Sequence, residues 1–113
     1  MALGRLVEGA KLIRELEGIS VTADADIFGS DLEAPDDGFW IIKIAANAAG
    51  YPKVKETPAG SATSRVAALN EASDLTANAE YEFWWTAKKG DKINVRFSSN
   101  AVVTVRVFFA RSS

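Results

Sequence analysis

The chain has 113 residues, 48% of them apolar, so it can bury one modest core and is expected to form a single domain. It contains neither cysteine nor histidine, which excludes disulfides, thiolate and imidazole metal sites, and the usual general base near neutral pH. Its formal net charge of −2 provides no basic field to attract nucleic acid or an anionic membrane. The composition therefore predicts a protein that is not an enzyme, holds no cofactor, and has neither nucleic acid nor a membrane as its partner.

Export and membrane insertion are not expected either. The longest apolar runs, such as residues 39–42 and 101–103, are too short for a transmembrane helix. The first thirty residues lack the apolar region of a secretory signal peptide.

Residues 1–18 form the first predicted segment, an N-terminal arm or short helix. Apolar residues recur there near the helical period, at Leu3, Leu6, Val7, Ala10, Ile13 and Leu16. Gly4 and Gly9 weaken a helix, so an extended arm is the alternative. The folded domain is then expected over residues 19–113.

From Ile19 onward the period changes to two. Residues 19–27 alternate between apolar and polar, which predicts a strand with one wet face. After a turn at 35–38, residues 39–46 are apolar on both faces except at Lys43, as expected of a strand covered on two sides. Short strands are also expected around residues 51–56 and 65–69.

The last third of the chain has the clearest alternation. Apolar residues alternate over 81–85, 93–97 and 103–109, and turns separate these runs at 88–91 and 98–100. The pattern predicts a three-stranded meander. Together with the earlier strands it predicts an all-β fold, a single antiparallel β-sandwich of jelly-roll type.

Charges are divided unevenly along the chain. Residues 1–38 hold nine acidic and three basic residues, whereas residues 39–113 hold six acidic and ten basic residues. We expect the two parts to neutralise each other within one fold; attraction between subunits is the alternative.

Three aspartates are the best metal candidates. Asp24, Asp26 and Asp31 lie close together in sequence, but calcium takes six to eight oxygen ligands and this segment lacks the features of an EF-hand loop. We expect solvated carboxylates there and no metal site.

Aromatic residues are the first candidates for an interface. Trp84 and its neighbour Trp85 must point to opposite faces of a strand, so one is expected in the core and the other at an interface. Trp40 and Tyr51 are further interface candidates, and with one of the paired tryptophans they could instead form a platform for sugars.

Basic and N-terminal residues complete the candidate interface. Lys88, Lys89 and Lys92 make a basic turn suited to an acidic protein surface. Leu12 and Leu16 of the N-terminal segment are expected to anchor it to a neighbour.

Three runs of sequence carry a family resemblance. DADIFGSDL at 24–32, LNEASDLTANA at 69–79 and KGDKINVRFS at 89–98, followed by a valine-rich strand, resemble small β-sandwich virion proteins of tailed phages and archaeal viruses. The resemblance covers roughly residues 19–110 and contains no catalytic motif. It implies a capsid-decorating or spike-like subunit, often a symmetric trimer, that binds the major capsid protein or another virion protein. Such a subunit is assembled in the host cytoplasm and lies on the virion surface.

Two other functions remain open. One is an extracellular filament subunit that assembles by strand addition. The other is a carbohydrate-binding β-sandwich.

Overall fold

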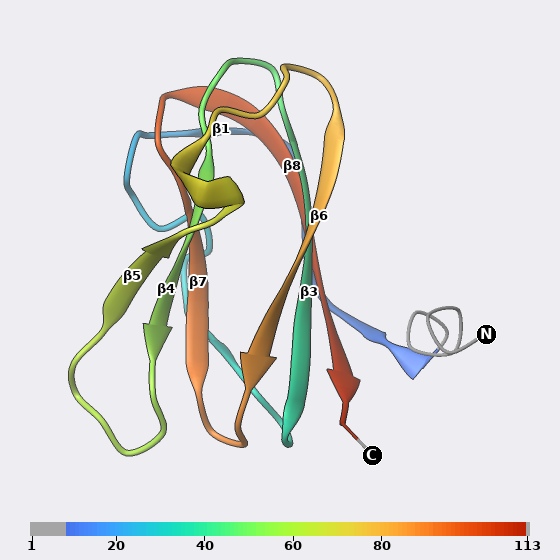
Figure 1. Cartoon of the computed structure of the whole chain (residues 1–113), viewed down its shortest axis with the longest axis vertical. Helices are drawn as coiled ribbons and strands as arrows, with labels where there is room; N and C mark the ends of the chain where they lie inside the picture. Colours follow the sequence, from blue (N-terminus) through green and yellow to red (C-terminus); the bar gives the residue numbers. More distant parts are fainter. Residues whose placement is uncertain (1–8, 113) are drawn as a thin grey trace.

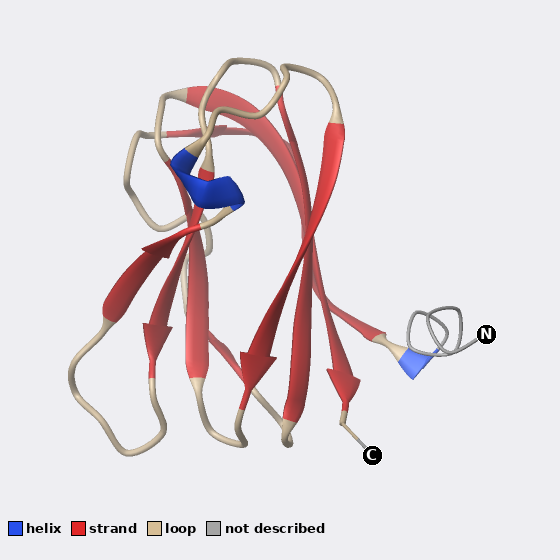
Figure 2. Cartoon of the chain, in the orientation of Figure 1, coloured by secondary structure: helices blue, strands red, loops and turns tan. Residues whose placement is uncertain are grey.

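Alternating apolar side chains bring eight strands together in two antiparallel four-stranded sheets that pack face to face (Figures 1 and 2). The computed structural model describes residues 9–112. We name the sheet with strand order β1-β8-β3-β6 sheet A and the sheet with order β2-β7-β4-β5 sheet B. The predicted all-β, jelly-roll-like sandwich is confirmed.

From β3 onward the strands follow the predicted runs closely, and a short 3₁₀ turn, η1, joins β5 to β6. Their bounds are β1 (Lys11–Val21), β2 (Leu32–Glu33), β3 (Gly38–Ala46), β4 (Pro52–Thr57), β5 (Arg65–Ala68), η1 (Asn70–Ala72), β6 (Glu80–Ala87), β7 (Lys92–Phe97) and β8 (Ala101–Arg111). Within residues 9–112 there is no helix long and apolar enough to cross a membrane.

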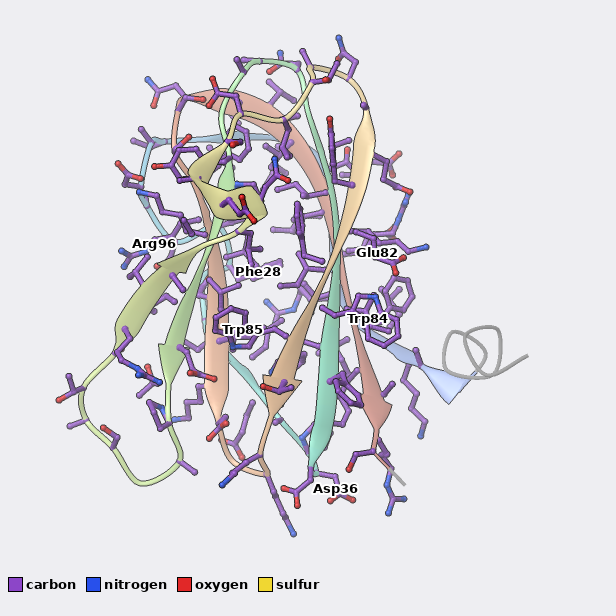
Figure 3. The ribbon with its side chains drawn as sticks, viewed as in Figure 1. Phe28, Asp36, Glu82, Trp84, Trp85 and Arg96 are labelled. Carbon is purple, nitrogen blue, oxygen red and sulfur yellow. The ribbon has the colours of Figure 1, made fainter. Side chains whose placement is uncertain are left out.

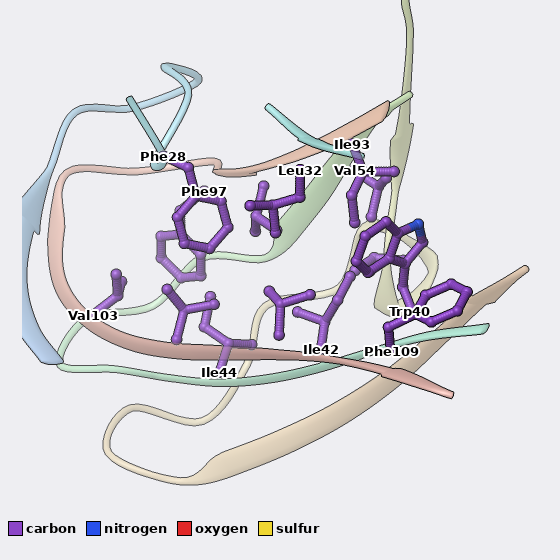
Figure 4. Close-up of a cluster of buried hydrophobic side chains, with 14 of the residues drawn as sticks. Phe28, Leu32, Trp40, Ile42, Ile44, Val54, Ile93, Phe97, Val103 and Phe109 are labelled. Atoms are coloured by element: carbon purple, nitrogen blue, oxygen red, sulfur yellow. The ribbon is translucent and has the colours of Figure 1, made fainter. Parts of the chain in front are cut away.

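The core lies between the inner faces of the two sheets (Figure 4). Trp40, Ile42 and Ile44 of β3 point inward, and residues such as Val54 and Phe97 meet them from sheet B. Each of these side chains is fully buried, and burial of one such side chain contributes about 1.5–3 kcal/mol. The period-two pattern therefore sets which residues form the core.

The predicted meander is wrong in its connections. β6, β7 and β8 form where expected, but β6 pairs with β3, β7 pairs with β4, and β8 pairs with β3 and β1. Each turn crosses from one sheet to the other, because both inner faces are apolar and must face each other. Asp91 holds the first of these turns by accepting a hydrogen bond from the Lys88 amide at 3.0 Å.

The N-terminal boundary also differs from the prediction. Residues 11–18 are neither an arm nor a helix but most of β1, which pairs along β8 in sheet A. Gly18 has a φ of +62° at a break in register, and its amide donates to Thr104 Oγ1 at 3.0 Å. The backbone N–H and C=O groups that a helix would pair within itself are paired with β8 instead. The part of the prediction that falls on residues 1–8 lies outside the described residues.

The predicted strand at 19–27 ends early, at Val21. Asp24 adopts a φ of +61°, and the following chain runs beside β7 as a loop. Phe28 from this loop enters the core with 2% of its surface exposed, and the Arg14 guanidinium lies 5.5 Å from the centre of its ring. The loop therefore closes the side of the sandwich between β1 and β2.

The uneven charges neutralise each other within the fold, as predicted. Six ion pairs join an acid of residues 1–38 to a base of residues 39–113: Asp24–Lys53, Asp26–Lys55, Asp31–Lys55, Asp26–Arg96, Glu15–Arg106 and Asp36–Arg111.

Candidate functional site

An apolar row crosses all four strands on the outer face of sheet A. It consists of Leu12 on β1, Phe108 on β8, Ile41 on β3 and Trp84 on β6, each of which is the register partner of the next. Phe39 extends it, with its ring centre 5.9 Å from that of Trp84. Leu12 is 51% exposed, and Figure 3 shows Trp84 on the side of β6 away from sheet B. Aromatic and aliphatic side chains gathered on an outer face are typical of an interface.

Local sequence explains why these residues face outward. In β8 the alternate residues Val103 to Phe109 fill the core, so Phe108 must point the other way. In β6, Trp85 points inward and donates to Glu56 Oε2 at 3.1 Å, which leaves Trp84 on the outer face. The prediction that the paired tryptophans divide between core and surface is consistent with this geometry.

A charged row lies beside the apolar row on the same face, two residues further along β8, β3 and β6 and three residues further along β1. Its members are Glu15, Arg106, Lys43 and Glu82, again joined by register. Arg106 pairs with Glu15, and the hydrogen bond that the guanidinium donates to this carboxylate raises the pKa of Arg106. Its Nη1 also lies 3.5 Å from Glu80, and Lys43 lies 3.8 Å from Glu82. Every charge of the row therefore has an opposite charge nearby on the same face.

The polar edge of Trp84 is satisfied as well. Its indole nitrogen donates to Glu82 Oε2 at 2.7 Å, and Lys43 Nζ lies 5.7 Å from the centre of the Phe108 ring. These charges and the indole N–H already have partners within the subunit. A second protein could therefore cover this face without leaving a buried charge or hydrogen-bond donor unpaired.

Two predicted interface residues face the core instead. Trp40 has no exposed surface and packs edge-on against Phe109 at 5.1 Å, and its indole nitrogen has no hydrogen-bond partner among the described residues. Leu16 packs against the core from the inner side of β1. The sequence does not show which face of β3 packs inward or that β1 begins at Lys11, and both predictions are wrong.

The other candidates lie elsewhere on the surface. Tyr51 stands just before β4, at the end of sheet B, where Lys53 Nζ lies 5.5 Å from its ring centre. Lys88, Lys89 and Lys92 are exposed at the turn between β6 and β7, and the structure records no ion pair for them within residues 9–112. The aromatic platform of Trp40, Tyr51 and Trp84 is therefore not assembled on one surface, while carbohydrate binding at another place stays a prediction.

The three metal candidates are held in ion pairs on the outer face of sheet B. Asp24 lies 2.6 Å from Lys53, and Asp26 lies 2.7 Å from both Lys55 and Arg96. Burial is the largest influence on Asp26 and raises its pKa, but the hydrogen bonds from Lys55 and Arg96 outweigh it, so the net pKa lies below 3.8. In the described part of the chain, no group of three acidic side chains is arranged to hold a metal ion.

A cleft of about 510 Å³ opens at the end of the sandwich between β5 and β6. Its carboxylates are already engaged: Glu56 accepts from Trp85 and lies 3.4 Å from Arg65, Asp91 accepts from the amides of Ala59 and Lys88, and Asp37 accepts from the Lys89 amide. The cleft therefore offers no unengaged buried acid–base pair among its lining residues.

The structure places three further residues in the site that the sequence analysis did not single out, Phe39, Phe108 and Ile41. The signal for Phe108 was its position beside Phe109, since adjacent large apolar residues on a strand cannot both face one core. Ile41 was included only within the strand predicted to be covered on two sides. Its exposure of 2% shows that neighbouring side chains already cover it on the outer face.

Comparison with solved structures supports the same architecture. The chain resembles a complement globular domain. The globular domain of zebrafish complement 1qA protein superposes with a TM-score of 0.52 and 11% sequence identity, over 92% of this chain and 95% of that one. This similarity shows a shared fold. No protein-family model matches the chain, and a search of curated proteins finds no match.

Proposed function

We propose that this protein is a non-enzymatic structural subunit that associates with copies of itself through the outer face of sheet A. The single observation that carries the proposal is the apolar row, which runs unbroken from β1 to β6 on that face. Leu12 and Trp84 lie at its two ends, so a neighbour could contact β1, β8 and β6 through the row and β3 through Phe39.

The charges of the face favour a second copy as the occupant. The charged row is compensated within the subunit, so it offers no net field that would select a strongly charged partner. An apolar surface with satisfied polar groups suits a contact between identical subunits related by a closed symmetry. In a threefold ring, different parts of the face, such as its β1 and β6 ends, would meet across each interface. We propose a trimer.

The setting we propose is a virion surface, where the oligomer decorates a capsid lattice. The resemblance of residues 19–110 to small virion β-sandwich proteins supports this setting, and the jelly-roll-like sandwich is compatible with it. The exposed turn with Lys88, Lys89 and Lys92 would then be available to an acidic patch of the lattice.

The test of self-association is the mass of the protein in solution. We expect light scattering and sedimentation to give a mass of about three chains at micromolar concentration, and Trp84→Glu to weaken association by tenfold or more. Val66→Glu is the matched control, because Val66 is a 48% exposed apolar residue on the outer face of sheet B. A monomer at every concentration, or equal loss in both variants, would overturn the proposal.

The virion setting is tested separately. We expect mass spectrometry to detect the protein in gradient-purified virus particles from the source culture. Its absence from such particles while the oligomer persists would remove the setting and leave self-association standing.

A further inference from the structure

β6 forms one border of sheet A, and on its outer side no strand of the described chain lies beside it (Figure 1). Its residues Glu80–Ala87 pair with β3 without a break in register. The other borders are less suited to pairing, because β2 and β5 have only two and four residues and β1 has two breaks in register. Within residues 9–112, β6 therefore has the longest uninterrupted border.

Hydrogen bonds at the end of β3 show which backbone groups lie on this border. The Asn47 amide donates to the Val102 carbonyl, on the β8 side of β3, at 3.0 Å. The Ala46 carbonyl points the other way and accepts from the Asn78 amide, just before β6, at 2.6 Å. Because successive residues of a strand bond to opposite neighbours, the even-numbered residues of β3 bond to β6.

The register extends this alternation to β6. The even-numbered residues of β3 pair with odd-numbered residues of β6, as Ile42 pairs with Phe83. The odd-numbered residues of β6 therefore bond to β3, and the N–H and C=O groups of Glu82, Trp84 and Thr86 point away from it. No other segment of residues 9–112 bonds to these groups. We call this row of backbone groups the free edge of β6.

The free edge lacks the features that keep strand edges apart. Proteins commonly protect an edge with proline, lysine, a bulge or an inward-pointing charge. β6, with the sequence EYEFWWTA, has none of these. Its two charges lie on the outer face, where Glu80 is 3.5 Å from Arg106 and Glu82 is 3.8 Å from Lys43. Half of its residues are aromatic and favour β structure, so the edge is suited to the addition of another strand.

A second copy of β6 matches this edge in its side chains and its charge. Antiparallel pairing centred on Trp84 places the Trp84 rings of the two copies next to each other on the outer face. It also places Glu80 of each chain opposite Lys88 of the other, an exposed lysine with no ion pair within residues 9–112. Pairing centred on Phe83 would provide neither contact. The Trp84 register is therefore the better match.

β1 of a second copy is a poorer partner for the free edge. Glu15 lies on the outer face of β1, so pairing of β1 with β6 would bring it to the face that carries Glu80 and Glu82. Like charges on opposite strands are destabilising. The breaks in register of β1 would also leave part of the ladder unpaired.

We propose that β6 of one chain pairs antiparallel with β6 of a second copy, about a twofold axis at Trp84. The two four-stranded sheets A then form one continuous sheet, and the apolar row of one copy continues into that of the other. Because it uses the edge of β6 rather than the outer face, this contact goes beyond the proposed function and connects neighbouring oligomers. An edge contact buries less surface than a covered face, so it forms at higher protein concentration than the trimer.

Disulfide formation tests the pairing and its register, since the chain contains no natural cysteine. In a mixture of Glu82→Cys and Thr86→Cys chains, the two thiols lie on directly opposite residues, with Cα atoms about 5.5 Å apart, which a disulfide can span. In the control mixture of Glu80→Cys and Thr86→Cys chains they are diagonal neighbours, about 7–8 Å apart. We expect at least tenfold more mixed disulfide in the first mixture. Equal or greater linkage in the control, or no linkage in either, would overturn the proposal.

A proline on the free edge tests the backbone contact itself. Thr86→Pro removes an N–H that β3 does not use, and proline is tolerated at such a position; the matched control Thr86→Ala keeps the N–H. Well above the micromolar range, we expect the mass by light scattering to rise beyond three chains for the original protein and for Thr86→Ala, but not for Thr86→Pro. A circular dichroism melt checks that both variants are folded. An equal rise in Thr86→Pro would overturn the edge contact.

The two self-contacts can fail separately. Leu12→Glu changes the outer face at β1, away from the free edge, so it should abolish the trimer and leave a pair of chains that Thr86→Pro separates. An original chain that reaches only two chains, and becomes a monomer with Thr86→Pro, would support the edge contact and overturn the proposed function. A trimer that forms no mixed disulfide and gains no mass would support the proposed function and overturn the edge contact.

Discussion

The two outer faces of the sandwich have the same strand architecture but different surfaces. On sheet B, Lys53, Lys55 and Arg96 point outward and are paired with aspartates of the loop that precedes β2. On sheet A, the corresponding outward positions include Phe108 and Trp84. The alternation of residues along a strand determines which side chains point outward. The register between strands determines whether those outward side chains form a polar or an apolar surface.

The largest contrast is expected between two phenylalanines. Phe28 fills the core beside sheet B with 2% exposure, so Phe28→Ala should lower the free energy of unfolding by about 3–5 kcal/mol. Phe108→Ala on the outer face of sheet A should cost less than half as much in the monomer. Urea unfolding in dilute solution measures both, so that association adds nothing to stability. Equal costs would mean that Phe108 belongs to the core rather than to a binding face.

A smaller effect is expected from the side chain that holds the sheet B loop. Asn94 is buried and bonds both the amide and the carbonyl of Phe28, at 3.0 and 2.9 Å, as well as Asp31. Asn94→Ala leaves those buried backbone groups without partners, so we expect a loss of about 2–4 kcal/mol. Asn100→Ala removes one exposed bond to the Ala23 amide and should cost about 1 kcal/mol in the same urea measurement. A loss at Asn94 no larger than that at Asn100 would show that the loop is held by its ion pairs alone.

The smallest effect concerns the ion pairs of sheet B and depends on pH. The pKa of Asp26 is lower in the folded protein than its ordinary 3.8, so its contribution is fully present above 3.8 and is lost as pH falls through the folded value. Asp26→Asn should therefore destabilise the protein at neutral pH, by at most about 1 kcal/mol because the carboxylate is partly exposed. Thermal unfolding from pH 7 downward should show the variant and the original chain converging in acid. A difference that grows in acid would contradict this account.

Much of the fold could be predicted from residue alternation. The inward residues of β3, β7 and β8 follow directly from their period of two, and the turns before β3 and β7 follow from proline, glycine and aspartate. The pairing of strands could not be predicted, because β6 to β8 would alternate in the same way in a meander or in a sandwich.

The candidate site was only partly predictable for the same reason. Trp84 could be placed on a surface because Trp85 beside it needs the opposite face. The apolar row could not be foreseen, since it exists only when β1, β8, β3 and β6 lie side by side in one register. The helical spacing of apolar residues over 3–16 also concealed that Leu16 lies on a strand and faces inward.

The strand order also constrains how the chain folds as it is synthesised. Sheet B is complete once β7 has emerged from the ribosome, because all its strands lie between Leu32 and Phe97. Sheet A must wait for β8, which is made last yet lies between β1 and β3. Until then one edge of β3 lacks its hydrogen-bonded partner, and pairing of β1 with β8 closes the longest loop in the domain. A nascent chain halted before Ala101 would therefore have sheet B and the β3–β6 pair but no place for β1, the kind of intermediate that chaperones bind.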